Sequence, residues 1–180
     1  MSIVVNQIQA QSNWFEVENT VGNFNFKMPE EPIFHQEDST MMYLTSIMDT
    51  TIIMQAHYTD QNQSDVLAQK EITSIDINAF YDNFVKLMLV DNENFTLESL
   101  EDVTLNNNIK GKEIGIKYQE AVENDAEDQI TKSLQTRFMF MRIFWYNQRT
   151  YIFTIDCLNT SLADLPTYKN TFFQSIFIHN

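Results

Sequence analysis

Apolar and polar residues alternate along much of the first third of the chain, which is the period-two pattern of β-strands. The pattern predicts strands at 14–18, 23–27, 33–36, 41–47 and 51–58. A Val21-Gly22 turn separates the first two. Pro29 and Pro32 then interrupt pairing, because proline has no backbone N–H to donate. The polar stretch 59–70 predicts a loop, with at most a short helical turn.

A helix follows, and its start is marked by Asp76, whose carboxylate can accept hydrogen bonds from the N–H groups of a first helical turn. After it, apolar residues recur at the spacing of one helical face: Ile77, Phe80, Tyr81, Phe84, Leu87 and Met88. A lone helix of this length is marginal in water. We therefore expect this face to lie on a sheet.

The second half is again dominated by strand patterns, at 95–105, 109–122, 138–146 and 150–158. The run 138–146 is apolar on both faces, which is typical of a central strand covered on both sides. It contains Arg142 among aromatic residues, where we expect a structural role, on a ring or against an acid. The acidic run 123–128 predicts a hairpin tip or loop.

The C-terminal segment predicts a short helix and a last strand. Asp164 is a candidate N-cap and Pro166 suits a first helical turn. One helical face carries apolar side chains, namely Leu165, Tyr168, Phe172 and Phe173. Residues 176–178 are expected to close the sheet as its last strand.

Length and composition favour one domain over 14–180, preceded by a flexible N-terminus or signal remnant at 1–13. The start lacks the basic and long apolar regions of a complete signal peptide, so export and a cytoplasmic location both stay open. No stretch is long and apolar enough to predict a transmembrane segment. With a net charge of −14, the surface would repel phosphate backbones and anionic lipids. Nucleic-acid binding is therefore disfavoured.

Candidate chemistry is sparse. Cys157 is the lone cysteine, so no intrachain disulfide can form, and its place in an apolar strand predicts a buried, inert thiol. The three histidines, His35, His57 and His179, adjoin no recognisable nucleophile motif. No phosphate-binding loop, dinucleotide fingerprint or zinc-ligand spacing is present. The sequence therefore implies no cofactor.

Four acidic residues form a weak candidate metal site: Glu123, Asp125, Glu127 and Asp128. Clustered carboxylates are ligands that a hard cation such as Ca²⁺ prefers. The run lacks the turning glycine and distal glutamate of an EF-hand loop. A solvated loop and a cation site are the two interpretations.

Two motifs carry a family resemblance. The segment Phe24-Asn25-Phe26-Lys27-Met28-Pro29-Glu30-Glu31-Pro32 resembles the entry of the PsbP-like fold family. Arg149-Thr150-Tyr151-Ile152-Phe153 and Phe172-Phe173-Gln174-Ser175-Ile176-Phe177 resemble its exit. The resemblance implies an α+β fold, an antiparallel β-sheet flanked by helices on both faces in an α/β/α sandwich. The family includes an extrinsic photosystem II subunit, a Ran-binding nuclear-import factor, bacterial exported proteins and secretion chaperones, and it implies no catalytic residues.

These features lead to three functional hypotheses. The first is a non-enzymatic protein-binding or accessory domain whose partner is another protein. The second is a chaperone-like carrier of an apolar segment, suggested by 9 Met and 14 Phe residues. The third is a hydrolase-type enzyme with two carboxylates in a cleft. The oligomeric state is open.

Overall fold

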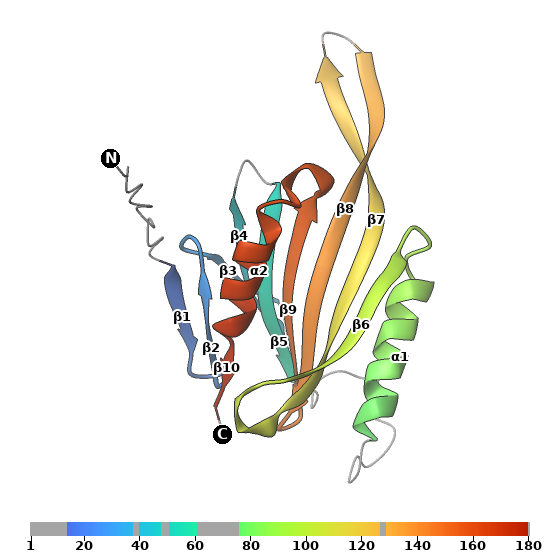
Figure 1. Ribbon diagram of the computed structural model, residues 1–180. Helices are drawn as coiled ribbons and strands as arrows, with labels where there is room; N and C mark the ends of the chain where they lie inside the picture. Colours follow the sequence, from blue (N-terminus) through green and yellow to red (C-terminus); the bar gives the residue numbers. More distant parts are fainter. Residues whose placement is uncertain (1–13, 38–39, 48–50, 61–75, 127–128, 180) are drawn as a thin grey trace, which may run out of the picture.

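The structure is a computed structural model that describes residues 14–37, 40–47, 51–60, 76–126 and 129–179 (Figure 1). The side chains of residues 107 and 123–132 also lie outside the described part. Within these ranges strands predominate and form two antiparallel sheets, and two α-helices and short 3-10 turns are also present. None of the described helices is long and apolar enough to cross a membrane.

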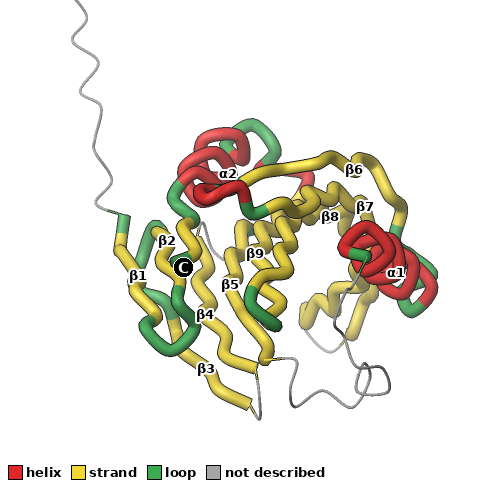
Figure 2. Tube along the Cα trace, turned by 90° about the horizontal axis from the view of Figure 1, so that it is seen from below, coloured by secondary structure: helices red, strands yellow, loops and turns green. Residues whose placement is uncertain are grey.

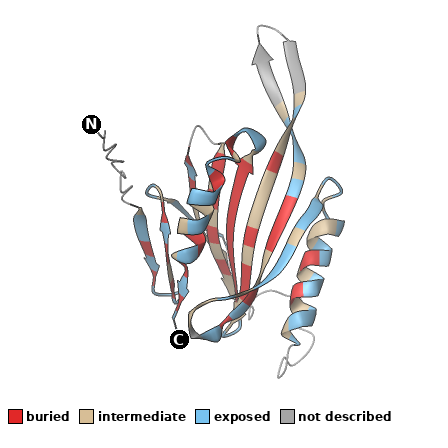
Figure 3. Cartoon of the chain, in the orientation of Figure 1, coloured by how far each residue is buried: buried red, intermediate tan, exposed pale blue. Residues whose placement is uncertain are grey.

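The larger sheet holds seven antiparallel strands in the order β3-β4-β5-β9-β8-β7-β6. The strands are β3 (Ile33–Glu37), β4 (Thr40–Ile47), β5 (Ile52–Asp60), β6 (Thr96–Thr104), β7 (Lys110–Ala126), β8 (Gln129–Tyr146) and β9 (Arg149–Leu158). Strand β9 lies between β5 and β8 and is buried along most of its length (Figure 3). The prediction that 138–146 belongs to the interior of the sheet is confirmed, because β8 lies between β7 and β9 and no described residue of 138–146 is exposed.

The smaller sheet has the order β1-β2-β10, formed by β1 (Phe15–Asn19), β2 (Phe24–Met28) and β10 (Phe177–Ile178). The prediction that the last strand closes the main sheet is wrong. Strand β10 pairs with β2 instead, with Ile178 opposite Phe24. The Ile178 side chain is fully buried together with those of Phe24 and Phe26. Burial of these apolar residues against one another therefore places the C-terminal strand beside the first hairpin.

Strands β7 and β8 are longer than their sequence patterns indicate. Strand β8 begins at Gln129 rather than Phe138, and β7 continues through 123–126. A hairpin tip or loop was predicted over 123–128, and β7 and β8 do form a hairpin here, with Ala126 opposite Gln129. Pairing with β6 ends at Lys117, and pairing with β9 ends at Arg137. Beyond these points the two strands pair only with each other in the described chain, and they project from the sheet (Figure 1). We call residues 118–126 and 129–136 the β7–β8 arm.

Helix α1 (Ile77–Val90) packs through Tyr81 and Val85. They join a cluster of sheet residues made up of Ile114, Ile116, Met141, Ile143 and Ile152. The predicted N-cap is confirmed, because an Asp76 carboxylate oxygen accepts from the Asn78 N–H at 3.0 Å and the Ala79 N–H at 3.4 Å. Leu87 was assigned to the packed face and is 58% exposed. It follows Val85 by two residues, about 200° around the helix.

Helix α2 (Leu165–Gln174) packs through Leu165, Phe172 and Phe173. The Phe172 ring meets Phe26 of the small sheet at 6.2 Å and Phe153 of the main sheet at 6.3 Å between centroids. The helix thus joins the two sheets, as the end-on view shows (Figure 2). Pro166 lies in the first turn as predicted, but the Asp164 side chain makes no capping hydrogen bond. Its backbone is already helical, which differs from the extended conformation of a capping residue.

Candidate functional site at the base of the β7–β8 arm

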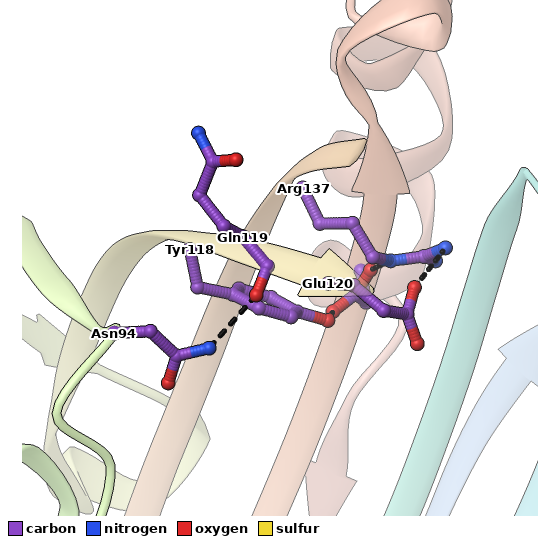
Figure 4. Close-up of polar contacts among 6 residues, drawn as sticks. Asn94, Tyr118, Gln119, Glu120 and Arg137 are labelled. Atoms are coloured by element: carbon purple, nitrogen blue, oxygen red, sulfur yellow. Dashed lines mark hydrogen bonds and ion pairs between the residues drawn. The ribbon is translucent and has the colours of Figure 1, made fainter. Parts of the chain in front are cut away.

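A buried polar cluster lies where the arm leaves the sheet (Figure 4). Tyr118 of β7 donates its hydroxyl hydrogen to Asp156 Oδ2 at 2.5 Å. Arg137 of β8 donates from Nε to Asp156 Oδ1 at 2.5 Å. The Nη1 of Arg137 also reaches Glu120 Oε2 at 3.4 Å. One carboxylate of β9 therefore ties together Tyr118, the first arm residue of β7, and Arg137, the residue that follows the arm in β8.

Strand register explains why these residues meet. Tyr118 lies directly opposite Arg137, and Asp156 lies opposite Met139, two residues further along β8. Residues two apart on a strand share a face. Tyr118 therefore extends the apolar stripe of Ile114 and Ile116 that faces α1. The cluster is the polar end of that stripe.

Burial and the Asp156 carboxylate together set the protonation states of Tyr118 and Arg137. The exposed fractions of Arg137 and Asp156 are 6% and 9%. Burial raises the pKa of Tyr118, and its hydrogen bond to Asp156 raises the pKa further. Burial lowers the pKa of Arg137, but the Asp156 carboxylate outweighs this and the net direction is upward. Both groups stay protonated at ordinary pH, so they act as hydrogen-bond donors rather than bases.

One donor of the cluster has no partner among the residues that the structure describes. It is the buried Nη2 of Arg137. A second contact supports the base from the α1 side, where Asn94 Nδ2 donates to the Gln119 carbonyl at 2.8 Å (Figure 4). The Phe95 ring also packs on Tyr118 at 5.0 Å between centroids. The base of the arm is thus tied both to β9 and to the segment that follows α1.

The sequence did not single out Arg137 or Asp156. Two signals were present: Asp156 interrupts the apolar run of β9, and Arg137 directly precedes the apolar run of β8. Strand patterns place neither charge beside the other until the order of the strands is known. The cluster depends on β8 lying between β7 and β9, which local periodicity does not encode.

The predicted cation site stays a prediction. The side chains of Glu123 and Asp125 lie outside the described part, as do Glu127 and Asp128 altogether. Backbone pairing places Glu123 and Asp125 in β7, opposite Lys132 and Ile130. Among the described residues, no group of three or more His, Cys, Asp or Glu side chains is arranged to hold a metal ion.

Arg142 has a structural position on the other face of β8, where it is partly buried. Its Nε donates to Glu113 Oε2 at 2.7 Å, and its Nη1 donates to the Phe173 carbonyl at 3.2 Å. Its guanidinium also lies 4.6 Å from the Phe173 ring centroid. Both expected contacts, ring and acid, are therefore present, and they fasten α2 to the sheet.

The cysteine and histidines do not form a catalytic pair within the described chain. Cys157 is buried, as predicted, and burial raises its pKa to about 11. The inertness of the thiol stays a prediction. It lies opposite Ile52, whereas His57 lies opposite Ile152 on the other face of the sheet. Burial lowers the pKa of His57 to about 4, and His35 is exposed on β3.

Comparison with known proteins identifies the fold. No protein-family model and no curated protein matches the sequence. Cyanobacterial PsbP (CyanoP) from Synechocystis sp. PCC 6803 superposes with a TM-score of 0.54 at 9% identity, covering 99% of this chain and 98% of that one. The chain has a PsbP/Mog1-like fold. The Ran-binding protein Mog1p of Saccharomyces cerevisiae matches with a TM-score of 0.52 at 12% identity, covering 93% of this chain and 96% of Mog1p. The predicted resemblance to the PsbP-like fold is thereby confirmed.

Proposed function

We propose that this PsbP/Mog1-like protein is a non-enzymatic accessory domain that binds another protein, and that the β7–β8 arm is its main contact. The observation that carries the proposal is the construction of the arm. Its base is fixed by the buried Tyr118–Asp156–Arg137 cluster, while its strands pair with no third strand in the described chain.

An arm of this kind gains from a partner. A two-stranded ribbon alone is marginally stable in water, because it buries little apolar surface. Leu134 is 72% exposed on the arm, opposite the exposed Ala121. A partner that covers this face would bury both side chains. Mog1p, which has the same fold, is named as a Ran-binding protein, and protein binding is the role that we infer for this chain.

The chemistry of the described residues supports binding more than catalysis. A general acid needs a carboxyl group whose pKa is raised toward neutrality. The pKa of Glu113 is instead lowered overall. Burial raises this pKa, but hydrogen bonds from Lys169 and Arg142 lower it by more. Three methionines, Met28, Met54 and Met141, lie in the core, which weakens the hypothesis of a methionine-lined carrier surface.

Two inferences about architecture accompany the proposal. We infer that residues 14–180 form a single domain, because the larger core cluster combines side chains of both sheets, from Val17 of β1 to Ile178 of β10. The two helices cover opposite faces of the main sheet. The support is that α1 packs on Ile152 and α2 packs on Phe153, adjacent residues of β9 that point to opposite sides.

Affinity capture tests the proposed function. The full chain would be presented to extract from its own cells, with covalent crosslinking and mass spectrometry to identify a saturable protein partner. Leu134→Glu should reduce capture about tenfold or more, as loss of a buried interface leucine does. Leu87→Glu, at an exposed leucine of α1, is the matched control and should capture normally. Equal capture by both variants would remove the arm from the proposal, and substrate turnover without any captured protein would overturn the binding role.

A further inference from the structure

Strand β3 forms one edge of the main sheet. All five of its residues are exposed, including Ile33 at 71% and Phe34 at 50%. The strand pairs with β4 on one side, and no described residue pairs with its other side. An edge strand offers unpaired N–H and C=O groups to any extended chain that approaches it.

The other described sheet edges are protected against such pairing. Strand β6 has a bulge between Leu97 and Ser99, and its exposed residues include three acids, Glu98, Glu101 and Asp102. Strand β1 exposes Glu16 and Glu18. The backbone of Ile178 in β10 is bonded by the Asn106 side chain. Bulges and charges are the usual means of blocking edge-to-edge pairing, whereas β3 presents isoleucine and phenylalanine.

We propose that β3 binds an extended segment of a partner protein, which adds to the main sheet as a further strand and is flanked by lysine or arginine residues. Backbone hydrogen bonds would supply affinity. Because Ile33 and Phe34 are neighbours in the strand and point to opposite faces of the sheet, an apolar side chain on each face of the segment would cover one of them. We expect basic residues in the segment because the surface around β3 is acidic. Glu30, Glu31 and Glu37 are exposed around β3, and the whole chain carries a net charge of −14. This inference rests on the proposed protein-binding function and names a second surface for it.

A second copy of the chain fits this edge poorly. Two copies paired antiparallel about His35 would place the apolar Ile33 of each opposite Glu37 of the other. Like-charged proteins also repel, which opposes self-association of a chain this acidic. A basic strand meets neither obstacle.

The probe is a nine-residue peptide with valine and threonine alternating over its centre and two lysines at each end. Its control replaces the lysines with glutamates. Amide chemical shifts and hydrogen exchange of the full chain would be followed by NMR during titration. We expect shifts and slowed exchange at residues 33–37 with the lysine peptide, and none with the glutamate peptide.

Two variants test whether the peptide binds at β3. Ile33→Lys places a like charge on the edge and should weaken the lysine peptide about tenfold or more. Val90→Lys, at a similarly exposed apolar residue of α1, should leave affinity within about twofold. Absence of peptide binding, or binding that leaves β3 exchange unchanged, would overturn the inference while leaving arm-dependent capture intact. If the β3 amides become protected from hydrogen exchange as the concentration of the protein alone is raised, the peptide-binding inference is overturned and β3 is an interface between two copies of the chain.

Discussion

Arg137 and Asp156 join β8 to β9 through a buried contact of 2.5 Å between Nε and Oδ1, and Arg137 is the first residue of β8 that pairs with β9. Their side chains are 8% and 13% exposed. At this depth, removal of one partner lowers the free energy of unfolding by more than the intact pair contributes to it, because the charge of the other partner stays buried. The contact therefore fixes the base of the β7–β8 arm in one arrangement.

Replacement of one partner tests this contact. Asp156→Asn should lower the free energy of unfolding by about 3 kcal/mol, because it leaves the buried Arg137 guanidinium with only the half-exposed Glu120 carboxylate, 3.4 Å away, as a counter-charge. Chemical denaturation measures the change. The double variant Arg137→Met with Asp156→Leu should recover most of the loss, since similar volumes are kept and the remaining charge, on Glu120, is half-exposed to solvent. A loss below about 1 kcal/mol for Asp156→Asn would mean that solvent already screens the pair.

Glu113 should make the protein sensitive to acid below pH 4.5, its ordinary pKa. The folded pKa is lower, because hydrogen bonds from Lys169 and Arg142 outweigh the effect of burial. The unfolded chain therefore binds a proton at Glu113 more readily than the folded chain does. The stability that ionised Glu113 contributes is complete above its pKa in the unfolded chain, and it is lost as the pH falls through its pKa in the folded chain. Glu113→Gln should cost about 2 kcal/mol at pH 7 and reduce the acid dependence. Denaturation at several pH values measures both effects, and Glu98→Gln on the exposed face of β6 should leave them unchanged.

The local elements were predictable from the sequence because each depends on short-range patterns. Strand alternation placed β1 to β5, and the spacing from Ile77 to Met88 placed α1. The arm was missed for a physical reason. None of the arm side chains that the structure describes is buried, so no apolar alternation marks residues 129–136.

The candidate site needed information that local patterns lack. Tyr118 lay on a predicted strand face, but Asp156 is 38 residues away from it in the sequence. Their contact requires the order β7-β8-β9 together with the register of each pair. The wrong placement of the last strand in the main sheet has the same cause. Helix α2 packs between the two sheets, and its path decides that β10 pairs with β2, which local patterns do not indicate.

His57 should add acid sensitivity in a higher range than Glu113. Burial lowers its pKa from 6.5 to about 4, so the folded chain keeps the imidazole neutral while the unfolded chain protonates it. This stabilisation is complete above pH 6.5 and is lost as pH falls toward 4, each unit of pKa difference corresponding to about 1.4 kcal/mol. Titration of the His57 ring protons by NMR should give a midpoint near 4. A midpoint near 6.5, the value for exposed His, would contradict the prediction.

Cys157 should resist thiol reagents in the folded protein. The side chain is buried and its pKa is raised to about 11 by burial, so little thiolate is present at pH 8. Reaction with a chromogenic disulfide should be slow in buffer and fast in denaturant. Rapid labelling of the native protein would show that β9 opens locally.

Gly111 and Gly115 lie on the same strand, and substitution by alanine should separate their roles. A Cβ at Gly111 would approach the Ile143 carbonyl oxygen to 2.4 Å, and backbone cannot rotate away. At Gly115 the 2.4 Å contact is with the Ser99 hydroxyl, which can change rotamer, and the Phe140 ring is 3.3 Å away. We expect Gly111→Ala to cost about 3 kcal/mol and Gly115→Ala about 1 kcal/mol, as overpacking does. Thermal and chemical unfolding of both variants measure the difference. Equal losses would imply that β7 and β8 shift apart at Gly111 to admit the methyl group.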